Sequence, residues 1–134
     1  MALPQTHAPM RSPLGRAIGL GSAKEGVEHW WRQRISSIAL VPLTLWFVVV
    51  VIRLAGTGLD AFTAWIGHPV PAVVMVLLLS ATFYHADLGL RVIVEDYVAP
   101  EWVKLVLIIL IRLGCIALGV AGVFAVLKIA LAAP

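Results

Sequence analysis

The stretch that decides the fold runs from Val70 to Val94 and reads VPAVVMVLLLSATFYHADLGLRVIV. A membrane-spanning helix needs about 20 predominantly apolar residues, so this stretch is long enough to cross a bilayer. His85 lies deep within it, and Asp87 and Arg91 follow in its last third. Because an ionisable side chain inside a bilayer is costly, His85 is the first candidate functional residue of the chain.

Two further apolar segments flank this stretch, Ile35–Ile52 and Leu105–Leu127. Of all 134 residues, 61% are hydrophobic and only 13% are charged, whereas a soluble domain has about 25% charged residues. The composition predicts an all-α integral membrane protein with three transmembrane helices. Pro42 removes a backbone hydrogen bond inside the first helix and predicts a modest kink there. The predicted spans are about residues 35–55, 70–94 and 104–128.

Several other kinds of site are excluded by what the sequence lacks. The single cysteine, Cys115, rules out an internal disulfide and any zinc or iron–sulfur site held by cysteines of this chain. No glycine-rich phosphate-binding motif is present. The basic residues are too few and too scattered to form a surface for nucleic acid, so no nucleic-acid partner is expected.

The distribution of lysine and arginine predicts the orientation of the chain in the membrane. The side that holds the N-terminus and the second connection carries most of these residues, and the opposite side carries only Arg53 and Lys128. The N-terminus is therefore expected in the cytoplasm. Residues 1–28, rich in Gly, Pro and Ser, are predicted to form an irregular cytoplasmic arm before a membrane domain at 29–134. The cations on the N-terminal side are Arg11, Arg16, Lys24, Arg32, Arg34, Arg91 and Lys104.

His85 has two interpretations. At about 100° per residue, Gly89 lies one turn further along the same helix face, where a bare backbone leaves room for a flat ring. Neutral imidazole is a good iron ligand, so His85 could be an axial haem ligand. It could equally be hydrogen-bonded to a neighbouring helix as a packing contact. The other histidines are poorly placed as second ligands, so a six-coordinate haem would need a ligand from another chain.

Asp96 and Tyr97 end the same helix. Asp96 comes eleven residues after His85, which corresponds to an angular offset of about 20° and a rise of about 16 Å. A phenol can donate a hydrogen bond to a quinone carbonyl, and a nearby carboxylate can orient the phenol or relay protons. The alternative is an ordinary interfacial tyrosine beside helix-end acids.

The remaining intramembrane charges suggest pairing and partners. Arg34 lies before the first span, at about the depth of the cytoplasmic end of the second span, and a guanidinium suits a haem propionate. Asp87 and Arg91 have i, i+4 spacing and are expected to pair with each other. The polar side chains of Arg112 and His85 cannot both find hydrogen-bond partners against lipid, which predicts partner helices.

These residues match a known pattern. The string from His85 through Gly89 to Asp96-Tyr97 resembles the His-x-x-x-Gly-x(6)-Asp-Tyr motif of the succinate dehydrogenase hydrophobic membrane anchor subunits of respiratory complex II. The segment Gln33-Arg34-x-Ser-x-Ile is similar to the sequence that begins the first span in the same family. The resemblance covers roughly residues 29–128.

The resemblance implies a membrane anchor of succinate:quinone oxidoreductase in a bacterial inner membrane. It implies a second three-span anchor, the cytochrome b subunit, as well as iron–sulfur and flavoprotein subunits and contact with membrane lipid. One haem b would lie between the two anchors with His85 as an axial ligand. Ubiquinone would be the electron acceptor. Tyr97 and Asp96 would belong to the quinone site, and Arg34 would lie near the propionates and the quinone pocket.

Two alternatives remain open at this point. An anchor of quinol:fumarate reductase would share the same features, because the sequence of an anchor does not fix the direction of electron flow. A cofactor-free structural or assembly subunit would use His85 only for packing.

Overall fold

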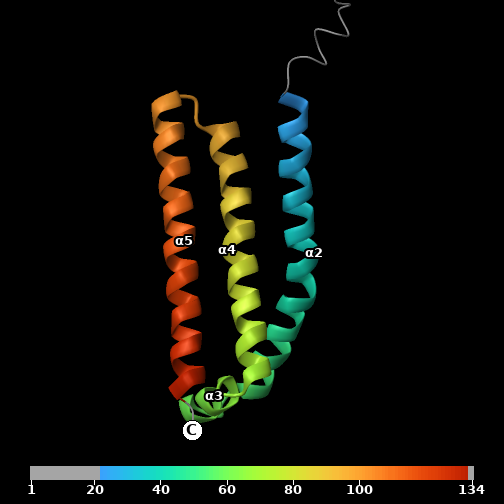
Figure 1. Cartoon of the computed structure of the whole chain (residues 1–134), viewed down its shortest axis with the longest axis vertical. Coiled ribbons are helices and arrows are strands. Elements are labelled where there is room, and N and C mark those ends of the chain that lie inside the picture. The colour runs from blue at the N-terminus through green and yellow to red at the C-terminus, as the bar shows by residue number, and fades with distance from the viewer. Residues whose placement is uncertain (1–21, 133–134) are drawn as a thin grey trace, which may run out of the picture.

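The computed structural model describes residues 22–132, which fold into four helices. Three long helices lie side by side with α4 between α2 and α5, and the short α3 lies across one end of them (Figure 1). The all-α prediction is confirmed for this part of the chain. The helices are α2 (Ser22–Leu54), α3 (Leu59–Ile66), α4 (Pro69–Tyr97) and α5 (Glu101–Ala132).

The three long helices are the membrane-spanning elements. Val27–Leu54, Pro69–Tyr97 and Glu101–Ala132 are each long and apolar enough to cross a bilayer. The second and third contain the predicted spans 70–94 and 104–128, and the first covers the predicted span 35–55 except its last residue. Little of their apolar surface is covered by the chain itself: in the most apolar part of α5, 0% of the residues are buried. These faces must therefore meet lipid or the helices of another subunit.

The first helix begins earlier than the sequence analysis predicts. Residues 22–28, expected to belong to the irregular arm, are helical in the structure. This segment contains Ala, Lys and Glu, which favour helices, and Glu28 forms an ion pair with Arg32 one turn later, a spacing that supports a helix. The rest of the predicted arm, residues 1–21, lies outside the described residues.

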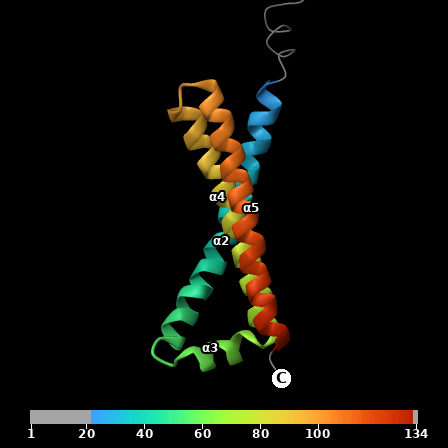
Figure 2. The same cartoon turned by 90° about the vertical axis from the view of Figure 1, so that its left-hand side faces the viewer.

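Helix α3 was not predicted from the sequence. Gly56 and Gly58 adopt φ angles of 82° and 85°, which glycine reaches without a steric penalty, and they turn the chain between α2 and α3. At the other end of α3, Pro69 occupies the first turn of α4, where its missing N–H is not needed. Figure 2 shows α3 bridging the gap between the diverging ends of α2 and α5.

The end of the bundle closed by α3 holds the main hydrophobic core. Ile66 is only 1% exposed, and the rings of Trp46 and Trp65 lie with their centroids 5.6 Å apart. Helix α2, which contains Pro42, curves in its second half (Figure 1), in agreement with the predicted kink. Between this part of α2 and the other helices is an apolar cavity of about 550 Å³. The buried core residues are Ile66, Ala72, Met75, Leu78 and Val126.

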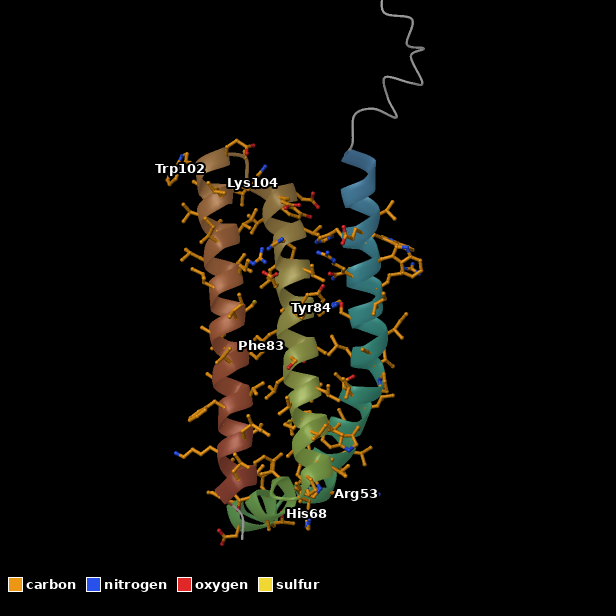
Figure 3. All side chains as sticks on the ribbon, in the orientation of Figure 1. Arg53, His68, Phe83, Tyr84, Trp102 and Lys104 are labelled. Carbon is orange, nitrogen blue, oxygen red and sulfur yellow. The ribbon has the colours of Figure 1, made fainter. Side chains whose placement is uncertain are left out.

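Glycines allow α4 and α5 to approach closely. A Cβ atom added at Gly119 would lie 3.5 Å from the side chain of Phe83, and one added at Gly122 would lie 3.3 Å from Leu79. Phe83 points from α4 toward α5 (Figure 3). Small residues at such a contact are typical of helix packing in membranes. This contact makes α4 and α5 a pair against which α2 packs through the opposite face of α4.

Candidate functional site

His85 faces α2 and is contacted there at both ring nitrogens. Its Nδ1 atom lies 2.9 Å from Ser36 Oγ, and its Nε2 atom lies 3.5 Å from Gln33 Nε2. Gln33 and Ser36 are three residues apart on α2, which places them on one face of the helix. Ser36 is buried, with 6% of its surface exposed. The site is therefore formed by two helices, and Ser36 and His85 are 49 positions apart in the sequence.

These contacts favour one position for the proton of a neutral His85 ring. The amide nitrogen of Gln33 can only donate, so the His85 Nε2 atom that faces it has the lone pair. In a neutral imidazole the proton is then on Nδ1, which donates to Ser36 Oγ. The serine hydroxyl is left free to donate to the Gln33 carbonyl, 2.9 Å away. In this arrangement the Ser36 hydroxyl both donates and accepts, and the lone pair of His85 Nε2 faces the side-chain amide of Gln33.

The side chain of Gln33 lies beside His85 Nε2, with its amide nitrogen 3.5 Å from that atom. A Cβ atom added at Gly89 would lie 3.5 Å from Gln33 Nε2, an ordinary contact, so the packing of this chain does not by itself require glycine there. Within the described part of the chain, Gln33 Oε1 is buried and has no hydrogen-bond partner, which is costly in an apolar setting. Gln33 thus occupies a position that another group could take at little cost.

A metal at this position would need ligands from outside the chain. Among the described residues, no group of three or more His, Cys, Asp or Glu side chains could hold a metal ion. His85 therefore provides one imidazole, and the other ligands must come from a porphyrin or from another subunit. This donor set fits a haem, whose macrocycle brings four of the ligands to iron. It does not fit a free zinc ion, which takes its ligands from protein side chains and water.

Asp87 and Arg91 form a second polar site on the opposite side of α4. Arg91 Nη2 lies 3.7 Å from Asp87 Oδ2, which confirms the predicted i, i+4 pair. Asp87 also lines a groove of about 590 Å³ between α4 and α5, together with Arg112 and Cys115 of α5. Asp87 and His85 are two residues apart and about 200° around the helix axis. The ion pair is therefore separate from the histidine site.

Asp96 and Tyr97 are placed at the end of α4, and Tyr97 is its last residue. Tyr97 is 84% exposed, and Asp96 is exposed as well. The Val98 N–H closes the helix by donating to the Val94 carbonyl at 3.1 Å. In the part of the chain that the structure describes, neither side chain touches the His85 site. Both are free to meet a ligand or a subunit from outside the chain.

The structure does not place Arg34 beside the other predicted site residues. Its guanidinium lies over the ring of Trp30, 4.6 Å from the ring centroid. Arg34 and Ser36 are about 200° apart around α2, so Arg34 lies on the face turned away from His85. The sequence argument placed Arg34 by its depth, and depth alone does not fix the face of a helix. Its proposed role toward a propionate or a quinone stays a prediction.

Gln33 and Ser36 are the site residues that the sequence analysis did not identify. Both lie in the Gln33-Arg34-x-Ser36 segment, but only the arginine was assigned a role there. Their i, i+3 spacing was the available signal, since it places two hydrogen-bonding side chains on one face of an otherwise apolar helix. The sequence could not show which helix that face would meet.

Comparisons with known proteins agree with this architecture. Residues 8–121 match a family described as succinate dehydrogenase/fumarate reductase transmembrane subunit. A succinate dehydrogenase hydrophobic membrane anchor subunit from Paracoccus denitrificans is 33% identical over 122 residues, which covers 91% of this chain and 94% of the relative. A protein of the same description from Rickettsia conorii is 31% identical over 116 residues, or 86% of this chain and 92% of the relative. A succinate dehydrogenase membrane anchor subunit from Reclinomonas americana is 30% identical over 92 residues, or 66% of this chain and 77% of the relative. No solved structure matches the chain.

Proposed function

The chain belongs to the succinate dehydrogenase/fumarate reductase transmembrane subunit family, and from this we propose that it is the hydrophobic membrane anchor of a succinate:quinone oxidoreductase that provides one axial ligand to haem b and part of the site for ubiquinone. The observation that carries the haem assignment is the pair of contacts to His85 from Ser36 and Gln33. They favour the imidazole tautomer whose Nε2 atom carries the lone pair that would bind a metal once the Gln33 side chain moves aside.

The residues around His85 each have a role toward the haem. His85 would supply the ligand nitrogen, Ser36 accepts the hydrogen bond from Nδ1–H and so holds the ring, and Gly89 leaves the space beside the ring free of a side chain. The Gln33 side chain would move away from His85 Nε2 to make room for the haem. When bound, the haem supplies a one-electron centre whose potential is set by its axial ligands and their hydrogen bonds. A second protein ligand would have to come from the partner anchor, because His85 is the imidazole that this chain offers at that depth.

The quinone acts at the end of α4. Tyr97, exposed at the helix end, donates its phenolic hydrogen bond to a quinone carbonyl oxygen. Asp96 lies next to it and passes protons toward the oxygen as the quinone gains two electrons and two protons. Arg34 supports this region through its positive charge, either toward a propionate or toward the quinone pocket. This chain positions the acceptor, while succinate is oxidised on another subunit.

The proposed partners suit the exposed surface and the site of this chain. The apolar faces of α2, α4 and α5 are covered by lipid and by the cytochrome b anchor. The iron–sulfur and flavoprotein subunits dock at the end of the bundle that holds Tyr97 and Lys104. Lys104 lies at this end and Arg53 and His68 at the other (Figure 3). With most cations on the Lys104 side, the N-terminus and the quinone site are at the cytoplasmic face of a bacterial inner membrane.

The competing hypothesis is a cofactor-free structural subunit, because the contacts of His85 also suit a packing histidine. A reduced-minus-oxidised spectrum of the purified complex separates the two. We expect a haem b band with the native chain and its loss with His85→Ala, while the complex remains assembled. An unchanged band in assembled His85→Ala complex would exclude ligation and favour the structural role.

A further inference from the structure

The hydroxyl group of Ser36 has a use that the anchor function alone does not require. Ser36 Oγ lies 2.9 Å from His85 Nδ1 and 2.9 Å from the Gln33 carbonyl oxygen. A serine in an apolar helix can satisfy itself by bonding to its own backbone, and Ser37 does so, through the Gln33 and Arg34 carbonyl oxygens. Of these two neighbouring serines, only Ser36 also contacts the His85 ring.

The direction of the Ser36–His85 bond follows from the third partner. Gln33 Nε2 lies 3.5 Å from His85 Nε2, where it can donate only to a ring nitrogen without a proton, so a neutral ring is expected to carry its proton on Nδ1, facing Ser36 Oγ. The carbonyl of Gln33 accepts the serine proton and thereby leaves a lone pair of Oγ directed at the ring. The serine hydroxyl is thus an acceptor toward His85 because of where its own proton goes.

We propose that Ser36 is a positioning residue that fixes the tautomer and the ring orientation of His85, so that its Nε2 lone pair is presented to iron. This inference rests on the proposed haem-anchor function. A hydrogen bond from the remote N–H of a ligating histidine holds the ring in place and makes the imidazole a stronger electron donor. Ser36 therefore raises the affinity of the site for haem and stabilises the oxidised iron relative to the reduced iron.

The test compares Ser36→Thr with Ser36→Val in the intact complex. The two side chains have nearly the same shape, and only threonine keeps the hydroxyl group. Haem per complex and the haem midpoint potential are measured, together with succinate oxidation by a dye acceptor as a check on assembly. We expect Ser36→Thr to resemble the native complex. Ser36→Val should bind haem roughly 10-fold more weakly and show a higher midpoint potential, with dye reduction unchanged. Ser37→Ala, which removes a serine with similar backbone bonds and no contact with His85, should match the native complex.

The possible failures are distinguishable. If His85→Ala leaves the haem spectrum unchanged, the proposed haem-anchor function is wrong. If His85→Ala removes the haem but Ser36→Val equals Ser36→Thr in haem content and potential, only the inference about Ser36 is overturned. If both Ser36 variants fail alike, in assembly or in haem content, Ser36 acts through its volume and the inference is again overturned.

Discussion

His85 and Asp87 are two residues apart on α4 and face different helices: His85 contacts Ser36 of α2, whereas Asp87 lines the groove that α4 forms with α5. One apolar helix therefore carries two polar sites at nearly the same depth, one on each side. The site toward α2 holds an imidazole whose ring nitrogens face Ser36 and Gln33, and the site toward α5 holds an ion pair. An imidazole is a good iron ligand, and the haem is therefore proposed on the α2 side.

The Asp87–Arg91 pair should be structural. The two side chains are 17% and 22% exposed, so removal of the carboxylate by Asp87→Ala leaves a poorly solvated guanidinium. We expect a loss of about 1–3 kcal/mol in stability, at or below the low end for broken buried pairs because the ions are 3.7 Å apart. Thermal unfolding of the complex in detergent measures it. The double variant Asp87→Ala/Arg91→Leu should recover most of the loss, and a double variant as unstable as Asp87→Ala would contradict the assignment.

Close packing of α4 against α5 depends on Gly119. Gly119→Leu would push against Phe83, whose ring already lies 3.5 Å from the position of a Cβ atom, and overpacking of this kind costs about 1–3 kcal/mol. Gly114 is on the same helix and has no neighbour within 4 Å of its added Cβ, so Gly114→Leu is the matched control. We expect only the Gly119 variant to lower the unfolding temperature in detergent. Equal effects would mean that helix propensity or contact with the partner subunit, and not Phe83, decides the result.

The sequence predicts the parts of this structure that depend on local composition. The three spans follow from apolar length, and the Asp87–Arg91 pair follows from helical spacing. Helix α3 was missed because eight residues bounded by Gly58 and Gly67 give too short a pattern to distinguish from a loop. The Ser36–His85 contact was missed because it depends on the rotation of α2 against α4, which is set by packing along the full length of both helices.

Ile66 should anchor α3 to the bundle. It is 1% exposed and contacts the core at the end of α4 and α5, so Ile66→Ala removes well-packed atoms and enlarges an existing cavity. We expect a loss of about 2–4 kcal/mol, measured by unfolding of the purified complex. Leu59, at the other end of the same helix, is 74% exposed, and Leu59→Ala should change stability by less than about 0.5 kcal/mol. A reversed order would indicate that α3 is held by a partner subunit.

The predicted orientation can be measured by cysteine labelling. In a Cys115→Ala background, Thr57→Cys places a thiol in the turn before α3, and Glu101→Cys places one at the start of α5. With the N-terminus in the cytoplasm, a membrane-impermeant maleimide should label Thr57→Cys in cells whose outer membrane is open to it, and should leave Glu101→Cys unlabelled. Labelling of Glu101→Cys only after the inner membrane is permeabilised shows that the thiol is reactive. Labelling of Glu101→Cys in unpermeabilised cells would reverse the assigned topology.

Tyr97 should affect quinone reduction and leave succinate oxidation intact. Tyr97→Phe removes one hydroxyl at a position that is 84% exposed in this chain, so the fold has little to lose. If the phenol donates to the quinone carbonyl, loss of a bond worth about 1.4 kcal/mol should lower the rate with quinone about tenfold. Succinate oxidation by a dye acceptor, which does not need the quinone site, should stay at the native rate. Tyr84, the other of the two tyrosines, lies on the same helix and lines the groove toward α5, so Tyr84→Phe controls for loss of a phenol elsewhere in the bilayer. A parallel fall of both activities in Tyr97→Phe would assign the residue to assembly, and equal quinone rates in the two variants would remove it from the quinone site.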